Sequence, residues 1–133
     1  MRIEFLDDLT DGGKFPQADS TRLVRLFDFD KLQASQLRQI IQEVIIDSGR
    51  SLDLSRLNFI QVVNCNLMLR ISDTDKGILM IDTQSFVCDM TIDKYREMIR
   101  LLRPFCDTET SGYQWLYDLD TPIDFLFSPG GFW

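Results

Sequence analysis

Three Asp-x-Asp pairs hold the residues of this chain that are best suited to chemistry. They are Asp28 with Asp30, Asp73 with Asp75, and Asp118 with Asp120. Residues two apart on a strand face the same side, so such a pair can share Mg²⁺, Mn²⁺ or Ca²⁺ through its carboxylate oxygens. One hypothesis is therefore a metal-dependent phosphotransfer or hydrolytic enzyme with Mg²⁺ or Mn²⁺ as cofactor. Asp28 and Asp30 would hold the metal, and Asp73 or Asp75 would supply the remaining ligand.

Residues 27–31, Phe-Asp-Phe-Asp-Lys, resemble the first strand of palm-type nucleotidyl-transfer domains. Those domains combine a βαββαβ core with metal-binding aspartates at that strand and at a hairpin. The chain departs from them in two ways: it has no glycine-rich acidic hairpin, and its basic residues are not clustered for a triphosphate. A structural role of the three pairs is favoured over a metal site, because Asp is a common residue of helix caps and turns. Asp30 would then cap a helix and the other pairs would form turns.

The 133-residue chain contains no histidine, which excludes the catalytic triads and most zinc or copper sites. It also has no P-loop, dinucleotide fingerprint or GxSxG motif. The formal net charge of −7 comes from 17 Asp and 4 Glu against 10 Arg and 4 Lys. This sign argues against nucleic-acid partners and against adhesion to anionic membranes.

The three cysteines, Cys65, Cys88 and Cys106, lie far apart in apolar runs. An odd number without a CxxC pair predicts buried free thiols in a reducing compartment. Cys106, just after an expected helix, is the candidate for a reactive thiol. The chain shows no signal core or membrane-spanning run, so we expect a soluble, cytoplasmic protein.

Residues 58–90 predict a central β-hairpin, with strands at 59–71 and from 77 onward joined by a polar turn. Further strands are expected at 2–8, 21–29, 113–117 and 123–127, the last of them at a sheet edge. An amphipathic helix should start at Asp30 and stop at Gly49, and a second should run from Thr91 or Asp89 to Pro104.

This order predicts one α+β domain over residues 1–133. An antiparallel sheet would carry both helices on one face, in the ferredoxin-like βαββαβ order, with an extra strand at each end.

Aromatic residues mark the other candidate site. Tyr113, Trp115 and Tyr117 alternate along an expected strand, and they form either a recognition surface or part of the core. Phe132 and Trp133 end the chain and are expected to pack on the sheet or on a second copy. Arg96, Arg100 and Arg103 recur at helical spacing, either as an anion site or, as favoured, a solvated face.

Together these features favour a small non-catalytic protein-binding module, acting by interaction or inhibition and needing no cofactor. Its partner would be another protein, of basic charge. In size and charge the chain resembles acidic inhibitors of the bacterial immunity type. A monomer and a homodimer both remain open. The Asp-cluster enzyme is the alternative.

Overall fold

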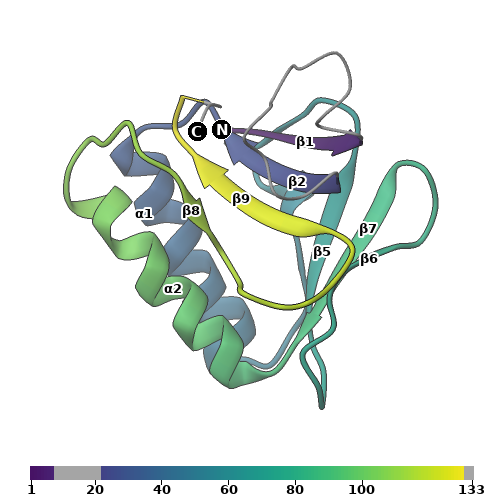
Figure 1. Cartoon of the computed structure of the whole chain (residues 1–133). Coiled ribbons are helices and arrows are strands. Elements are labelled where there is room, and N and C mark those ends of the chain that lie inside the picture. Colours follow the sequence, from purple (N-terminus) through teal and green to yellow (C-terminus); the bar gives the residue numbers. More distant parts are fainter. Residues whose placement is uncertain (8–21, 131–133) are drawn as a thin grey trace.

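The computed structural model of the chain describes residues 1–7 and 22–130. Within these ranges, nine strands form two mixed sheets, accompanied by two α-helices (Figure 1). The strands are β1 (Arg2–Asp7), β2 (Arg22–Phe27), β3 (Leu52–Asp53), β4 (Gln61–Val62), β5 (Asn66–Ile71), β6 (Gly77–Met80), β7 (Ser85–Met90), β8 (Gln114–Trp115) and β9 (Asp124–Ser128). The helices are α1 (Lys31–Ile40) and α2 (Ile92–Asp107).

The first sheet has the order β4-β1-β2-β9-β8 and joins the two ends of the described chain. β1 and β2 are antiparallel, β9 runs parallel to β2, and β8 runs antiparallel to β9. Side chains alternate across this sheet, as the period of a strand requires. Val24 and Phe125 face the main core, whereas Leu23 and Leu126 form a separate apolar cluster with Trp115.

The second sheet has the order β3-β5-β7-β6, in which β5 and β7 are parallel and β6 is antiparallel to β7. An ion pair fixes the register of the two parallel strands. Arg70 on β5 lies opposite Asp89 on β7 and donates to both of its carboxylate oxygens, at 2.7 and 2.8 Å. Because Asp89 is only 7% exposed, a slip by one residue would leave a buried carboxylate unpaired.

The two helices pack side by side and run in opposite directions (Figure 1). Asp30 caps α1 by accepting from the Gln33 backbone N–H at 2.8 Å, and Thr91 caps α2 through the Lys94 N–H at 3.3 Å. α1 continues into a π-helical stretch, η2 (Ile41–Asp47). The chain then leaves through Gly49, whose φ of +65° suits a helix stop.

The core lies between the two sheets and the helix pair. Phe5 of the first sheet contacts Phe86 of the second, with ring centroids 4.7 Å apart. Phe127 stacks on Phe29 at 4.1 Å and meets Phe105 of α2 edge-on at 5.1 Å. Each fully buried side chain of this size stabilises the fold by about 1.5–3 kcal/mol.

The ferredoxin-like antiparallel sheet expected from the sequence is wrong, because the strands divide between two mixed sheets. The expected central hairpin is wrong as well. The apolar run from residue 77 reverses at residues 81–85, where the Ile81 N–H bonds to the Ser85 carbonyl. Its second half, β7, therefore inserts between β5 and β6 and pairs with both.

Three smaller expectations also need correction. β9 is an interior strand between β2 and β8, not an edge strand. Pro104 does not end α2, which continues to Asp107. The expected strand 113–117 is reduced to the two residues of β8. The caps at Asp30 and Thr91 and the stop at Gly49 are confirmed.

Candidate functional site

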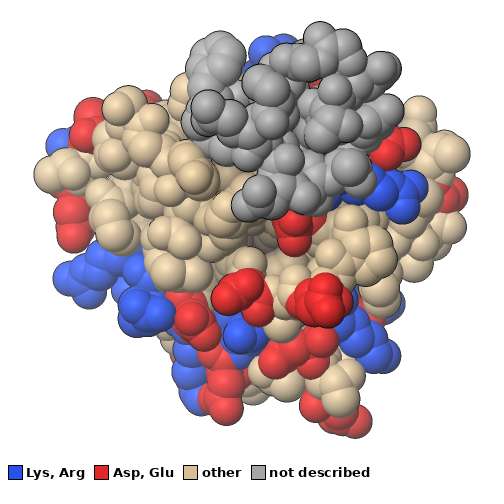
Figure 2. Space-filling view, viewed as in Figure 1, with Lys and Arg blue, Asp and Glu red and all other residues tan. Residues whose placement is uncertain are grey.

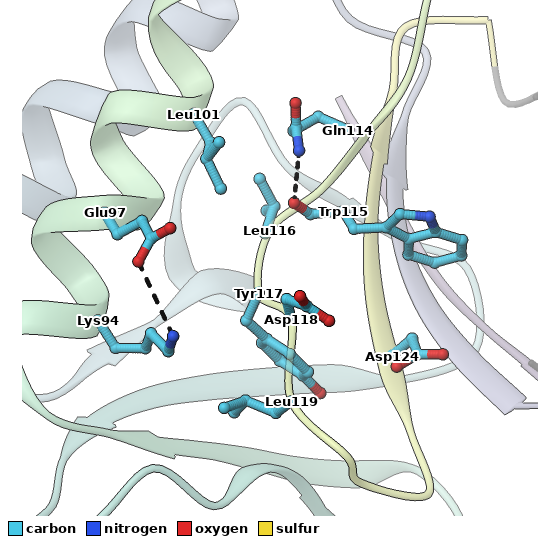
Figure 3. A pocket seen from close by; sticks show the side chains of 10 residues that line it. All are labelled: Lys94, Glu97, Leu101, Gln114, Trp115, Leu116, Tyr117, Asp118, Leu119 and Asp124. Atoms are coloured by element: carbon cyan, nitrogen blue, oxygen red, sulfur yellow. Dashed lines mark hydrogen bonds and ion pairs between the residues drawn. The ribbon is translucent and has the colours of Figure 1, made fainter.

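A pocket of about 510 Å³ lies between α2 and the segment that follows it (Figure 3). Lys94, Glu97 and Leu101 form its wall on α2. The facing wall is formed by residues 114–119, with Asp124 of β9 beside it. Its volume lies within the usual range for ligand pockets, about 300–1,000 Å³.

Helical geometry positions the α2 wall. Residues 94, 97 and 101 follow the i, i+3, i+7 spacing, so they lie along one flank of the helix. The neighbouring stripe, Tyr95, Met98, Ile99, Leu102 and Phe105, is buried and fixes how the helix is rotated. The polar flank is thereby turned toward residues 114–119.

The facing wall is anchored by a buried tyrosine. The Tyr117 hydroxyl donates to the Ile123 carbonyl and accepts from the Ile78 backbone N–H at 3.1 Å. Burial raises the pKa of Tyr117 above its usual value, so the hydroxyl keeps its proton and can donate. The Leu116 N–H bonds to the Phe125 carbonyl at 2.8 Å. These three hydrogen bonds hold the start of the loop 118–122 in place.

Gly77 brings a second acidic turn beside this loop. A Cβ atom at Gly77 would lie 3.0 Å from the Tyr117 hydroxyl and 3.2 Å from Thr121 Oγ1. The turn that carries Asp73 and Asp75 leads directly into Gly77. Two Asp-x-Asp segments that are far apart in the sequence therefore lie close together in the fold.

Acidic side chains gather on this face of the molecule (Figure 2). Asp118 and Asp120 are exposed, and neither has a hydrogen bond or ion pair within residues 1–7 and 22–130. The three arginines of α2 differ, because each is paired along its own helix. Arg96 contacts Asp93 at 3.2 Å, Arg100 contacts Glu97 at 3.4 Å, and Arg103 contacts Asp107 at 3.7 Å. They form the solvated face that the sequence favoured.

The aromatic candidates are only partly brought together. Tyr117 is buried, with 4% exposure, and belongs to the core. Tyr113 is 45% exposed and meets Trp115 edge-on, with ring centroids 6.2 Å apart. Trp115 points away from α2 and packs with Leu126 (Figure 3). Phe132 and Trp133 lie outside the described residues.

The four carboxylates proposed for a metal are not brought together. Asp30 caps the start of α1, next to the end of α2, where Glu109 accepts from the Lys31 N–H at 3.2 Å. Asp75 accepts from the Thr91 N–H and hydroxyl at the opposite end of α2. A helix of 16 residues is about 24 Å long, too far for one ion to span. In the described part of the chain, no three His, Cys, Asp or Glu residues form a cation site.

Asp28 and Asp73 have other positions. Asp28 directly follows β2 and has φ of +56°, a left-handed conformation that Asp adopts more readily than most residues. Its N–H bonds to the Pro129 carbonyl at 2.9 Å, which ties the chain to the end of β9. Asp73 is exposed in the turn before β6.

The thiols of Cys65 and Cys88 are buried, and burial raises the pKa of each to about 12. Neither is therefore ionised near neutral pH. Cys106 is partly exposed, and its Sγ donates to the Leu102 carbonyl at 3.4 Å. All three cysteines are free.

Sequence reasoning missed the α2 wall and the leucines of the pocket. In the sequence, Lys94, Glu97 and Leu101 lie beside the apolar stripe of the expected helix. Only their helical spacing indicates that they share one flank of it. Leu116 could not be found because residues 113–117 predict a regular strand, and Leu119 lies just beyond that segment. Asp118 and Asp120 stand out in the sequence as a pair, but nothing in the sequence indicates the pocket beside them.

Comparisons with protein-family models, curated proteins and solved structures found no match for this chain. No helix within residues 1–7 and 22–130 is long and apolar enough to cross a lipid bilayer.

Proposed function

We propose that this protein is a non-catalytic protein-binding module that docks a basic partner on its acidic face. One observation carries the proposal. Asp118 and Asp120 are exposed carboxylates on an anchored loop, without ion pairs among the described residues, and Asp118 lines a pocket to which three leucines contribute. A rim of charged residues around apolar contact area is the usual arrangement of a protein interface.

The anchoring of the loop supports this role. Tyr117 at its start is buried, and Ile123 at its end is buried with only 3% exposure. The Thr121 hydroxyl also donates to the Ile123 carbonyl, at 3.3 Å. A loop held in this way loses little conformational entropy on binding, so more of the contact energy is available for affinity.

The charge of the whole chain supports a basic partner. A net charge of −7 creates a field that speeds encounter with a positively charged surface. Such steering raises the association rate and weakens as salt screens it, over about 8 Å at physiological ionic strength. The partner would therefore bind fast at low salt and more slowly as salt is added.

The test is affinity capture with matched variants. The protein is immobilised and exposed at low salt to an extract of the source cells, and bound proteins are eluted with salt. One variant carries Asp118→Asn and Asp120→Asn. The control carries Glu43→Gln and Asp47→Asn, which remove the same charge from the other helical segment, where Glu43 lines a different groove with Phe59.

A supporting result has two parts. A basic protein is retained by the wild type and by the control but is lost by the Asp118/Asp120 variant. The purified partner then binds about twofold to thirtyfold more weakly to that variant, as two exposed charge contacts of about 0.2–1 kcal/mol each would give. Equal retention by both variants would contradict the proposal, because the acidic face would then make no specific contribution.

A further inference from the structure

The pocket beside Asp118 has the chemistry to receive one particular side chain. We propose that it is an arginine-binding pocket, filled by an arginine of the basic partner. This inference rests on the proposed function and narrows it to a contact. Three features carry it: the size of the pocket, its apolar walls and the placement of its charges.

The walls suit the stem of an arginine. Leu101 of α2 and Leu116 of the facing segment lie on opposite sides of the upper pocket, and Leu119 lies at its lower end (Figure 3). Leu116 is 1% exposed, so its position is fixed by the core. The three methylenes of an arginine can pack against such surfaces while the charged end reaches polar groups.

The charges suit the guanidinium. Asp118 lies on one side, exposed and without an ion pair among the described residues. Glu97 lines the pocket from α2, and its ion pairs with Lys94 and Arg100 are long, at 3.8 and 3.4 Å. Ion pairs this exposed contribute little, so Glu97 can exchange partners at small cost. A planar guanidinium with five donors can contact both carboxylates, which a compact ammonium does less well.

Among the described residues that line the pocket, Lys94 is the one cation. Its ammonium lies toward Glu97 and competes with an incoming arginine for that carboxylate. Removing this ammonium should therefore strengthen arginine binding. Removing the Asp118 charge should weaken it. The two substitutions should therefore change the affinity for arginine in opposite directions. Residues with a purely structural role would not produce this result.

The first experiment uses N-acetyl-arginine methylamide as the probe, titrated into the ¹⁵N-labelled protein and followed by NMR. We expect a saturable shift of the backbone amides of Lys94, Leu116 and Asp118. The neutral isostere citrulline, blocked in the same way, should give no saturable shift, and the lysine derivative a weaker one. Shifts centred on the turn 73–76, or equal shifts with citrulline, would overturn the inference.

The variants provide the second experiment. Asp118→Asn should weaken arginine binding about threefold to tenfold, and Lys94→Met should strengthen it by a similar factor. Lys31→Met is the control, because it removes the same charge at the exposed start of α1 and should leave the affinity within twofold. If Lys94→Met and Lys31→Met act alike, only bulk charge matters and the pocket proposal fails.

The two proposals can fail separately. A partner that is lost with the Asp118/Asp120 variant but binds Lys94→Met and wild type equally would leave the acidic docking face standing and overturn the arginine pocket. Arginine binding in the pocket without any charge-dependent partner would overturn the proposed function.

Discussion

Replacing Gly77 by alanine should both destabilise the fold and disturb the candidate site. Gly77 has φ of +71°, a conformation that L-residues rarely adopt. The added Cβ would lie 3.0 Å from the Tyr117 hydroxyl and 3.2 Å from Thr121 Oγ1. Tyr117 cannot move freely, because its hydroxyl bonds to both Ile78 and Ile123. The strain therefore falls on the loop that carries Asp118.

The size of the effect can be worked out with Gly49 as the reference. Gly49 has a similar φ of +65°, but a Cβ there would meet nothing within 4 Å. Gly49→Ala should therefore lower the free energy of unfolding only through strain in the left-handed backbone, by about 1–2 kcal/mol. Gly77→Ala should lower the free energy of unfolding by the same backbone strain and by about 1–3 kcal/mol more, because the added methyl group crowds a packed site. The difference between the two variants isolates the contact with Tyr117.

Urea unfolding of the wild type and both variants measures these free energies. For a chain of this length, each kcal/mol corresponds to roughly 4 °C in melting temperature. We expect Gly77→Ala to melt several degrees below Gly49→Ala, and to shift the NMR amide signals of residues 118–122. Equal stability of the two variants would refute the reasoning, since the packing of Gly77 on Tyr117 would then contribute nothing.

Three further predictions concern Tyr117, the buried thiols and the aspartates near the ends of α2. Tyr117→Phe should lower the free energy of unfolding, measured by urea titration, by about 1–3 kcal/mol, because the Ile78 N–H loses its hydrogen-bond partner. An unchanged free energy of unfolding would mean that water replaces the hydroxyl. Burial raises the pKa of the Cys65 and Cys88 thiols from 9.0 to about 12, so these thiols ionise at a lower pH in the unfolded chain than in the folded protein. Their contribution to the free energy of unfolding is fully present below about pH 9 and should be lost as the pH rises toward 12. Unfolding at pH 8 and 10.5 tests this, and a flat profile would contradict burial of the thiols. Calorimetric titration with millimolar Mg²⁺, Mn²⁺ or Ca²⁺ should give no saturable heat, since Asp30 and Asp75 lie at opposite ends of α2. A binding isotherm that Asp30→Asn abolishes would restore the metal hypothesis.

The sequence by itself determined the local structure of this protein. The 3.6-residue periodicity and the capping residues Asp30 and Thr91 located both helices, and Gly49 marked a helix end. Alternation located most of β1, β2, β5 and β9. These signals are local, because a cap or an apolar stripe needs only residues within a few positions.

Only the tertiary structure decided how these elements pair. The apolar run from residue 77 fits one long strand as well as two short ones, and its reversal at 81–85 turns an expected hairpin into a parallel β5–β7 pair. The preference between these pairings comes from partners distant in sequence, such as Arg70 and Asp89. Periodicity within one segment carries no information about such partners.

For the candidate site, too, the sequence determined one part and the tertiary structure the other. Asp118 and Asp120 stood out in the sequence, but Asp-x-Asp is equally typical of turns, caps and metal sites. What gives them a neighbouring pocket is the packing of α2 against residues 114–119 and the burial of Tyr117. A buried tyrosine and an exposed one look alike in an alternating run, because burial depends on what the rest of the chain places above it.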